Sequence, residues 1–410
     1  MDRALLIGII LPKVSDGDVK NHLDELKMLA QTANVDTLGE ITQKVQRINP
    51  AFYIGKGKAQ QVIDQAILLG ANVIIFDDEL SPAQIKNYHK LAKKIKVIDR
   101  SSLILDIFKN HAKTREAKTQ VELALCQYLL PRLTRQWTHL ERQMGGVGTR
   151  AGMGETQIEI DRRLIREKIS KLKIDLKKID SERKTQSQNR KKEYRVALVG
   201  YTNAGKSTLF NSLTGNDVYV ENQLFATLDT TVRKLKLNKK HQVLLSDTVG
   251  FIRKLPHNLV ASFRSTLKEL LEANHILIVL DASSNIIEEH LETINLVLNE
   301  LGANGIPKSY IFNKIDLIKK DVYLRKLKTS FNNAIFISAL HHLKLDNIKK
   351  HLIDKVESDF NIFELNVAYD QGKILSEIQE QAEILDTDYG DEFIKLKIRG
   401  REKSIKKLFK

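Results

Sequence analysis

The sequence predicts an α/β protein in which a P-loop nucleotide-binding domain is flanked by smaller modules. First, a short apolar strand at Arg195–Val199 leads into the glycine-rich loop Gly200–Thr208 and then into a helix. Second, residues 1–111 alternate short apolar segments with segments of helical spacing. Third, residues 112–192 carry apolar residues three and four apart, which is typical of long helices. We therefore expect domains at residues 1–111, 112–192, 193–360 and 361–410.

Composition limits the class of protein. The chain has 410 residues, enough for about two to four domains, and 42% hydrophobic residues, enough for a packed core. It lacks an apolar run near the roughly 20 residues that span a bilayer, so we expect no stable membrane insertion. Met1–Leu11 predicts a strand, not a signal peptide. The single cysteine, Cys126, excludes an intramolecular disulfide and favours the cytosol. The net charge of +15 favours an anionic partner, with nucleic acid before acidic lipid.

The first 111 residues are expected to form a small parallel or mixed α/β sheet. The basic segment Gly55–Lys58 could touch phosphate or RNA, although a tight turn is the better interpretation. Ser81 and Pro82 predict the start of a helix. Strands are expected at Ala4–Ile10, Thr37–Val45, Val73–Phe76 and Lys96–Ile98, and helices at Asp18–Ala33, Lys58–Leu69, Pro82–Lys93 and from the cap Ser101 to Phe108.

The next segment predicts a long antiparallel helical hairpin with a glycine-rich tip. Apolar residues recur from Val121 to Leu140, where Pro131 should kink the helix, and again from Ile165 to Ile179. The tip, Met144–Thr156, carries several glycines and Arg150, and Thr156 with Glu159 predicts a capping box. Two interpretations stay open, a simple connector and a tip that approaches a polyanion. The basic face of Asp161–Arg195 is typical of a solvated helix, ending in the linker Ser187–Lys192.

The glycine loop fits the pattern G-x-x-x-x-G-K-[ST] and lies between a strand and a helix, the context that this motif needs. Glycines let backbone N–H groups turn toward phosphate oxygens, and the helix N-terminus adds positive potential. Lys206 should reach the β- and γ-phosphates, and the Ser207 hydroxyl should bind Mg²⁺. The predicted contacts are Gly200, Tyr201, Thr202, Asn203, Ala204, Gly205, Lys206 and Ser207.

Two later segments predict the parts that sense the γ-phosphate. Thr227, on a polar loop after the first helix, can bind Mg²⁺ and contact the γ-phosphate. A hairpin of Val232–Leu237 and Gln242–Leu245 leads to a D-x-x-G motif, in which Asp247 should hold a Mg²⁺-bound water and the Gly250 N–H should meet the γ-phosphate. Lys206, Thr227 and Gly250 are thus the catalytic candidates, and Ser207 and Thr227 the metal ligands. The further contacts are Phe225, Ala226, Thr227, Leu228, Asp229, Asp247, Thr248, Val249 and Gly250.

The base is predicted by the segment that follows the strand Tyr310–Phe312. A carboxylate at Asp316 can accept hydrogen bonds from guanine N1–H and the 2-amino group, which adenine does not offer together. This disfavours an ATPase. Asn313 should tie loops together, Lys314 should cover the base, and a backbone N–H after the strand Ile335–Ile337 should reach guanine O6. The expected contacts are Asn313, Lys314, Ile315, Asp316, Ser338, Ala339 and Leu340, which make a GTP/GDP-binding P-loop GTPase domain.

Two residues predict how hydrolysis proceeds. Phe251 stands where many small GTPases have the glutamine that orients water, so we expect slow intrinsic turnover that a partner raises. Asn203 adds the option of K⁺ beside the phosphates.

The sequence of the last domain predicts the order strand, helix, strand and helix and carries no recognisable motif. These elements are expected at Phe363–Val367, Lys373–Ile384, Phe393–Ile398 and Lys403–Phe409.

The glycine segment Gly145–Glu159 and the nucleotide motifs together resemble the HflX family of translation-associated GTPases, over the chain from the first strand to the C-terminal module. The glycine segment is the most specific part of the resemblance. Two positions depart from the family pattern, which usually has Arg-Gly-Pro-Gly at Arg150–Gly154 and Asp-Pro-Thr at Asp229–Thr231. Neither departure touches a predicted phosphate or base contact; they bear on tip geometry and loop stiffness.

The resemblance implies a cytoplasmic, Mg²⁺-dependent GTPase that binds the large ribosomal subunit and its rRNA and helps to split stalled or idle ribosomes. We expect it to be a monomer. Two other functions remain open at this point. One is an RNA-binding regulatory module in which GTP is a ligand and hydrolysis is incidental. The other is a GTPase that regulates a membrane or metabolic partner, for which peripheral membrane association would be expected.

Overall fold

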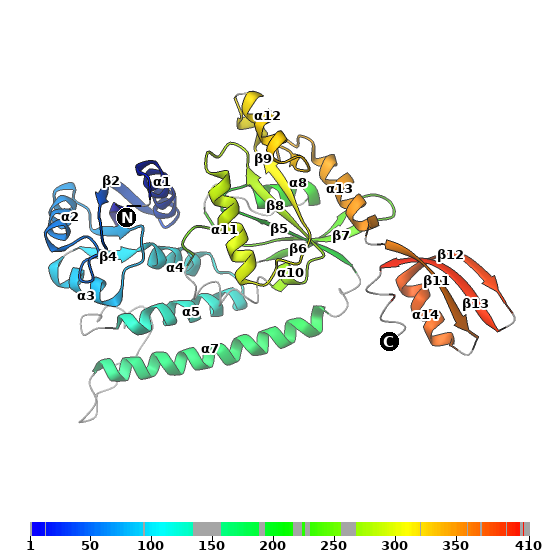
Figure 1. Ribbon diagram of the computed structural model, residues 1–410. Helices are drawn as coiled ribbons and strands as arrows, with labels where there is room; N and C mark the ends of the chain where they lie inside the picture. The colour runs from blue at the N-terminus through cyan, green and yellow to red at the C-terminus, as the bar shows by residue number, and fades with distance from the viewer. Residues whose placement is uncertain are drawn as a thin grey trace.

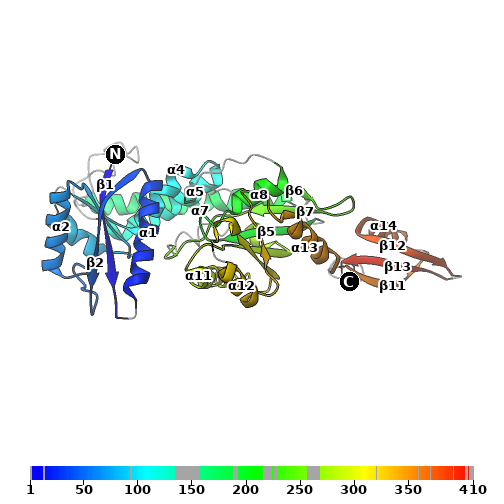
Figure 2. The same ribbon diagram turned by 90° about the horizontal axis from the view of Figure 1, so that it is seen from above.

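The computed structural model describes residues 2–12, 14–92, 95–133, 157–187, 193–215, 224–225, 230–255, 268–319, 321–358, 360–369, 371–390, 392–401 and 405. It contains three sheets, which follow one another in a row in both views (Figures 1 and 2). The α/β fold predicted from the sequence is confirmed. The domain boundaries themselves stay a prediction. No helix among the described residues has the length and apolar character that a bilayer crossing needs.

The N-terminal α/β region has a four-stranded parallel sheet in the order β2-β1-β3-β4. Apolar residues of α1 and α4 pack on one face, and those of α2 and α3 pack on the other. The two helix pairs bury alternate residues of the same strands, as the two-residue period of a strand requires. The elements are β1 (Asp2–Ile10), α1 (Asp16–Thr32), β2 (Val35–Lys44), α2 (Lys56–Leu69), β3 (Val73–Phe76), α3 (Pro82–Leu91), β4 (Lys96–Asp99) and α4 (Arg100–His111).

Helix starts in this region follow side-chain capping. Ser81 caps α3 in a capping box, with Pro82 in the first turn, as predicted. The predicted cap at Ser101 is wrong. Asp99 caps α4 instead, because its carboxylate accepts the Ser102 N–H at 2.8 Å and the helix therefore begins at Arg100. Gly55, with φ of +86°, precedes α2 directly, so the basic segment forms the entry to that helix.

Two helices run beneath the sheets, α5 (Arg115–Leu129) and α7 (Gln157–Ser187), and they lie side by side in Figure 1. Leu123 and Cys126 of α5 share an apolar cluster with Ile165 and Leu172 of α7, and Lys168 pairs with Glu122 at 2.6 Å. Up to Leu133, where this described stretch ends, the α-helix does not pass through Pro131. It ends at Leu129, and the proline lies in the 3-10 helix η1 (Leu130–Arg132), because proline has no N–H to extend the α-helical ladder. The glycine-rich tip and Thr156 lie outside the described residues.

The domain that carries the predicted nucleotide motifs, here called the GTPase domain after that prediction, has a six-stranded sheet in the order β10-β9-β8-β5-β7-β6. In this sheet β6 is antiparallel to β7 and the other pairs are parallel. Helices α8 and α13 cover one face, and α10, α11 and α12 cover the other. The elements are β5 (Tyr194–Gly200), α8 (Lys206–Thr214), β6 (Thr231–Lys236), β7 (Gln242–Asp247), α10 (Lys268–Leu271), β8 (His275–Asp281), α11 (Ile287–Glu300), β9 (Lys308–Asn313), η3 (Ile315–Leu317), α12 (Asp321–Ser330), β10 (Ile335–Phe336) and α13 (Leu345–Ser358).

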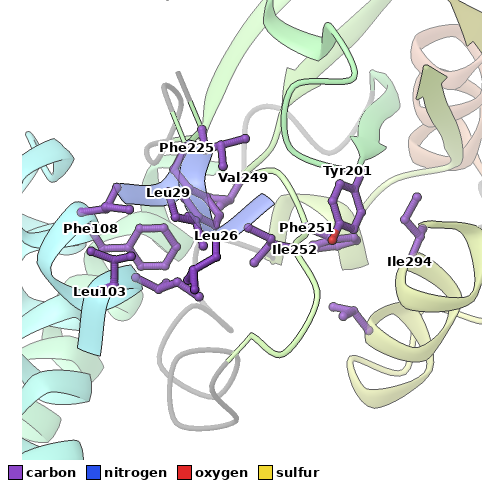
Figure 3. Close-up of a cluster of buried hydrophobic side chains, with 14 of the residues drawn as sticks. Leu26, Leu29, Leu103, Phe108, Tyr201, Phe225, Val249, Phe251, Ile252 and Ile294 are labelled. Atoms are coloured by element: carbon purple, nitrogen blue, oxygen red, sulfur yellow. The ribbon is translucent and has the colours of Figure 1, made fainter. Parts of the chain in front are cut away.

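One apolar cluster continues from the N-terminal α/β region into the GTPase domain (Figure 3). Leu26 and Leu29 of α1 and Phe108 of α4 meet Phe225 and Phe251 there. The rings of Phe108 and Phe225 pack edge to face, with their centroids 4.5 Å apart. The two regions are therefore joined by a buried core as well as by the chain.

The C-terminal module is a three-stranded antiparallel sheet in the order β11-β13-β12, with α14 packed on one face. Its elements are β11 (Phe360–Ala368), α14 (Gly372–Gln381), β12 (Ala382–Tyr389) and β13 (Phe393–Arg401). The predicted helix Lys373–Ile384 ends at Gln381, and β12 was missed. Ile384 belongs to that strand, where it pairs with Ile398 across the sheet. The predicted final helix, Lys403–Phe409, lies outside the described residues apart from Ile405.

Candidate nucleotide-binding site

The phosphate loop turns between β5 and the start of α8, at the carboxyl ends of the parallel strands. Asn203 and Gly205 have positive φ angles of 60° and 88°. A Cβ at Gly205 would lie 2.2 Å from Nδ2 of Asn313, so only glycine fits this position. Lys206 is buried and donates to the carbonyl oxygens of Gly200 and Tyr201, at 3.2 and 2.9 Å. Burial lowers the pKa of its ammonium to about 8.

Ser207 and Asp247 meet behind this loop. The Ser207 hydroxyl donates to Oδ2 of Asp247 at 2.6 Å, although the two residues come from different motifs. A hydroxyl and a carboxylate are the hard oxygen donors that Mg²⁺ prefers. The Asp247 side chain is buried at the end of β7, so it needs a cation or donor beside it. The residues present therefore fit a Mg²⁺ ion at this position.

Gly250 packs closely against Lys206 and Thr202 of the phosphate loop. A Cβ added at Gly250 would lie 2.9 Å from Nζ of Lys206 and 2.9 Å from Cγ2 of Thr202. Its backbone therefore approaches the lysine more closely than a larger residue would allow. Thr248, two residues before Gly250, is fully buried and donates its hydroxyl to the Leu198 carbonyl at 2.7 Å, and Val249 lies in the apolar core. These two side chains hold the segment in place.

Asn313 braces the loops around the site. Its amide donates to the Ala204 carbonyl at 3.0 Å, and its carbonyl oxygen accepts the Ala339 N–H at 2.9 Å. One buried side chain therefore fixes the phosphate loop against the segment after β10. The sequence predicted this tie without identifying its two partners.

The predicted base-recognition residues lie at the same end of the sheet. Lys314 has a positive φ of 62° and pairs with Asp281 at 2.7 Å. Asp316, in η3, lies 3.6 Å from His341. Of the predicted backbone donors, Ser338 N–H bonds to Leu343 O and Ala339 N–H bonds to Asn313, which leaves Leu340 as the candidate for guanine O6.

The side chains of two predicted site residues make contacts within the protein, and four predicted site residues cannot be placed. Phe225 is a core residue packed on Phe108, with φ of 59°. The Tyr201 side chain stacks on the His290 ring, at a centroid distance of 3.8 Å. Ala226, Thr227, Leu228 and Asp229 lie outside the described residues.

Sequence reasoning missed a cluster of charged residues at the junction with the N-terminal α/β region. This charged cluster comprises Glu25, Asp77, Arg100, Arg253 and Lys254. Arg100 is buried and donates to Glu25 and to Asp77, the latter at 2.7 Å. Arg253, two residues after Phe251, donates to the other oxygen of Asp77 at 2.8 Å. No sequence motif marks these residues, because they come together only in the folded chain.

Comparison with known proteins decides the family. Residues 20–109 match the family model for the GTP-binding GTPase N-terminal region, residues 111–190 the GTP-binding GTPase middle region, and residues 195–314 the model described as 50S ribosome-binding GTPase. A GTPase HflX from Flavobacterium psychrophilum is 45% identical over 376 residues, which cover 87% of this chain and 90% of that protein. The chain belongs to the HflX GTPase family.

A second curated relative agrees with this placement. The GTPase HflX of Escherichia coli is 40% identical over 92% of this chain and 88% of its own length. A solved complex of SsGBP with GDP is 28% identical, covers 87% of this chain and 98% of that chain, and has a TM-score of 0.47. The family models and the two GTPase HflX relatives confirm the predicted family, the P-loop GTPase fold, GTP hydrolysis and the use of GTP, GDP and Mg²⁺. The protein is a GTPase of a ribosome-associated family.

Proposed function

We propose that this HflX-family GTPase is a switch that binds the large ribosomal subunit and splits stalled or idle ribosomes. The observation that carries the proposal is the match of residues 195–314 to the 50S ribosome-binding GTPase model. The formal charge of +15 supports a contact with ribosomal RNA, since a polyanion attracts a basic protein. In this proposal the protein acts in the cytoplasm as a monomer.

Contacts between the nucleotide loops and the N-terminal α/β region support a switch. Tyr201 of the phosphate loop donates its hydroxyl to Glu25, and Arg253 binds Asp77. Gly250, three residues before Arg253, lies against Lys206, where a γ-phosphate would bind. A change of nucleotide that moves Gly250 would therefore also move the N-terminal α/β region.

We assign hydrolysis to Lys206, Thr227 and Gly250, and the Mg²⁺ ion to Ser207 and Thr227, with Asp247 beside it. Lys206 would bind the β- and γ-phosphates, and the Gly250 N–H would donate to the γ-phosphate. When bound, Mg²⁺ supplies positive charge to the phosphate oxygens. The base would be held by the Asp316 carboxylate, the Lys314 stem and a backbone N–H of Ser338–Leu340. The remaining segment Gly200–Ser207 would cradle the phosphates with its backbone.

Phe251 supports slow intrinsic turnover. Its side chain is buried in the core and has no group that could orient water. Asn203, with its left-handed backbone, supports a K⁺ ion next to the phosphates as a further cofactor. Measuring single-turnover hydrolysis in K⁺ and in Na⁺ tests the ion. A faster rate in K⁺ is expected, and equal rates would remove K⁺ from the proposal.

Ribosome splitting is tested on sucrose gradients. Intact ribosomes are incubated with the protein and GTP, and the conversion to free subunits is measured. The Lys206→Ala variant, which should not bind GTP tightly, is the matched control. We expect splitting by the unaltered protein and none by the control. Ribosomes that stay intact, while the protein hydrolyses GTP, would refute the splitting activity. Intact ribosomes that still bind the protein would favour an RNA-binding module in which hydrolysis is incidental.

A further inference from the structure

Arg253 lies close to the phosphate loop because the chain before it is hydrogen-bonded to that loop. The Phe251 N–H donates to Gly200 O at 3.0 Å, and the Thr202 N–H donates to Phe251 O at 2.8 Å. Arg253 follows two residues later and lines a cavity of about 350 Å³ together with Thr202 and Asn203. Among the described residues that line this cavity, Arg253 is the only lysine or arginine. Its side chain therefore shares this cavity with Thr202 and Asn203 of the phosphate loop.

The guanidinium of Arg253 is bound by the N-terminal α/β region. Its Nη2 donates to Oδ2 of Asp77 at 2.8 Å, and the same oxygen accepts Nζ of Lys254 at 3.0 Å. Its Nε is buried, has no hydrogen-bond partner among the described residues, and lies 3.9 Å from Glu25. The arginine is thus held through one of its nitrogens, while another of its donors remains unused.

Asp77 stays ionised in this arrangement. Burial alone would raise the pKa of its carboxyl, but Arg100, Lys254 and Arg253 together bring that pKa below its ordinary value. Asp77 immediately follows β3, so its position is fixed by the N-terminal sheet. Whether Arg253 is held therefore depends on where that sheet lies relative to the GTPase domain.

Tyr201 ties the same contact to the phosphate loop. Its hydroxyl accepts the Arg253 N–H at 2.8 Å and donates to Glu25. The backbone of Arg253 is thereby kept beside the loop even if its side chain leaves Asp77. A movement of the N-terminal α/β region would remove Glu25 and Asp77 together, because both belong to that region.

An arginine could supply positive charge to the hydrolysis site. In the reaction, the water oxygen forms a bond to the γ-phosphorus as the bond from that phosphorus to the bridging oxygen breaks. The electron pair of the broken bond leaves with GDP, and the protons of the water pass to the released phosphate and to solvent. Negative charge on the phosphoryl and bridging oxygens can be stabilised by a guanidinium, which is worth about 10³- to 10⁵-fold in rate.

We propose that Arg253 is a catalytic arginine that the N-terminal α/β region withholds through Asp77. When that region moves, the guanidinium turns within the cavity toward the γ-phosphate and donates hydrogen bonds to its oxygens, without exchanging a proton. Contact with a partner that displaces the region would then raise the rate. The inference rests on the GTPase activity of the chain, and only its second test also uses the proposed binding to large ribosomal subunits.

A double-mutant cycle tests the proposal in single-turnover GTP hydrolysis without ribosomes. Asp77→Asn keeps an oxygen that can accept from Arg100 and replaces the oxygen that binds Arg253 and Lys254. We expect it to raise the rate at least about tenfold, as a fraction of the effect of a free arginine. Adding Arg253→Ala should remove this gain, whereas adding Lys254→Ala should not. The affinity for GDP with aluminium fluoride should rise and fall in the same order, with GDP affinity constant.

Two results of this mutant cycle would overturn the proposal. One is an unchanged rate in folded Asp77→Asn, which would show that nothing is withheld. The other is an Asp77→Asn rate that survives Arg253→Ala, which would show that another group acts. If thermal unfolding shows that Asp77→Asn is not folded, hydrolysis stimulated by large ribosomal subunits is measured instead. Arg253→Ala should then lose at least about 10²-fold of the stimulated rate, and Arg253→Lys less. An undiminished stimulated rate would contradict the assignment.

Discussion

The Ser207 hydroxyl donates to Oδ2 of Asp247 at 2.6 Å. This contact joins the phosphate loop to the D-x-x-G segment in front of the helix N-terminus of α8. It places one hydroxyl and one carboxylate where a divalent cation can bind with the phosphates. The geometry of this pair underlies the first prediction.

Ser207→Ala should weaken GTP binding mainly when Mg²⁺ is present. The hydroxyl is an expected ligand of the ion, and alanine cannot replace it. Fluorescence titration with a labelled GTP, with and without Mg²⁺, measures the effect. We expect a loss of roughly tenfold or more in Mg²⁺ and a much smaller loss in chelator. An equal loss in both conditions would mean that Ser207 serves only Asp247.

The lowered pKa of Lys206 predicts that GTP binding depends on pH. Burial lowers the pKa of its ammonium to about 8. Phosphate binding needs the charged form, so above pH 8 the site must take up a proton as GTP binds, and the affinity should fall as pH rises. Calorimetry in two buffers of different ionisation enthalpy measures this uptake. Lys206→Ala should lose roughly 10²-fold in affinity and take up no proton at this site. Equal affinity at pH 7 and pH 9 would contradict the prediction.

Asp316→Asn should shift the preference away from guanine. The carboxylate can accept two hydrogen bonds from guanine, whereas an asparagine side chain offers one acceptor and one donor. We expect the affinity for GTP to fall by at least about 10²-fold and that for XTP, which has an oxygen in place of the 2-amino group, to rise. Competition titrations with the two nucleotides measure the ratio. An unchanged ratio would place the base elsewhere.

A second pH effect is expected on stability. The Ser309 hydroxyl lies 2.8 Å from the Nε2 atoms of both His275 and His351, in a buried part of the GTPase domain. Burial, with smaller effects of His351 and Lys355, lowers the pKa of His275 from 6.5 to about 4. Between these values the unfolded chain binds a proton that the folded chain does not, so stability should fall as pH falls through this window.

Thermal unfolding at pH 7, 6 and 5 tests this effect. The melting temperature should decrease stepwise toward pH 5. His275→Gln, which cannot be protonated, should show a smaller decrease than the unaltered chain. If the decrease is the same in both proteins, His275 does not account for it.

The sequence predicted those parts of the fold and of the site that are determined by residues close together in the chain. The loop Gly200–Ser207 and its flanking strand and helix are set by neighbouring residues, and so is the start of α3 at Ser81 and Pro82. β12 was not predicted, because Ala382–Tyr389 continues an apolar spacing that also suits a helix. Its strand state depends on pairing with β13, which follows directly at Phe393, and an apolar spacing does not reveal this pairing.

The charged cluster could not be predicted for a related reason. Glu25 and Asp77 are ordinary surface residues by sequence, and Arg100 opens a helix, where a basic residue usually faces solvent. Arg100 is nevertheless fully buried, because two carboxylates and a carbonyl from three separate segments surround it. Only the packing of the N-terminal α/β region on the GTPase domain brings these groups together.

The central claim is that the nucleotide controls binding to the large ribosomal subunit, and co-sedimentation tests it most directly. The protein is pelleted with 50S subunits in GDP or in a non-hydrolysable GTP analogue. The account predicts pelleting with the analogue but not with GDP, less pelleting as salt rises, and loss of pelleting, with GTP binding intact, when Gly145–Gly154 is deleted. Equal pelleting in GDP and in the analogue would contradict it.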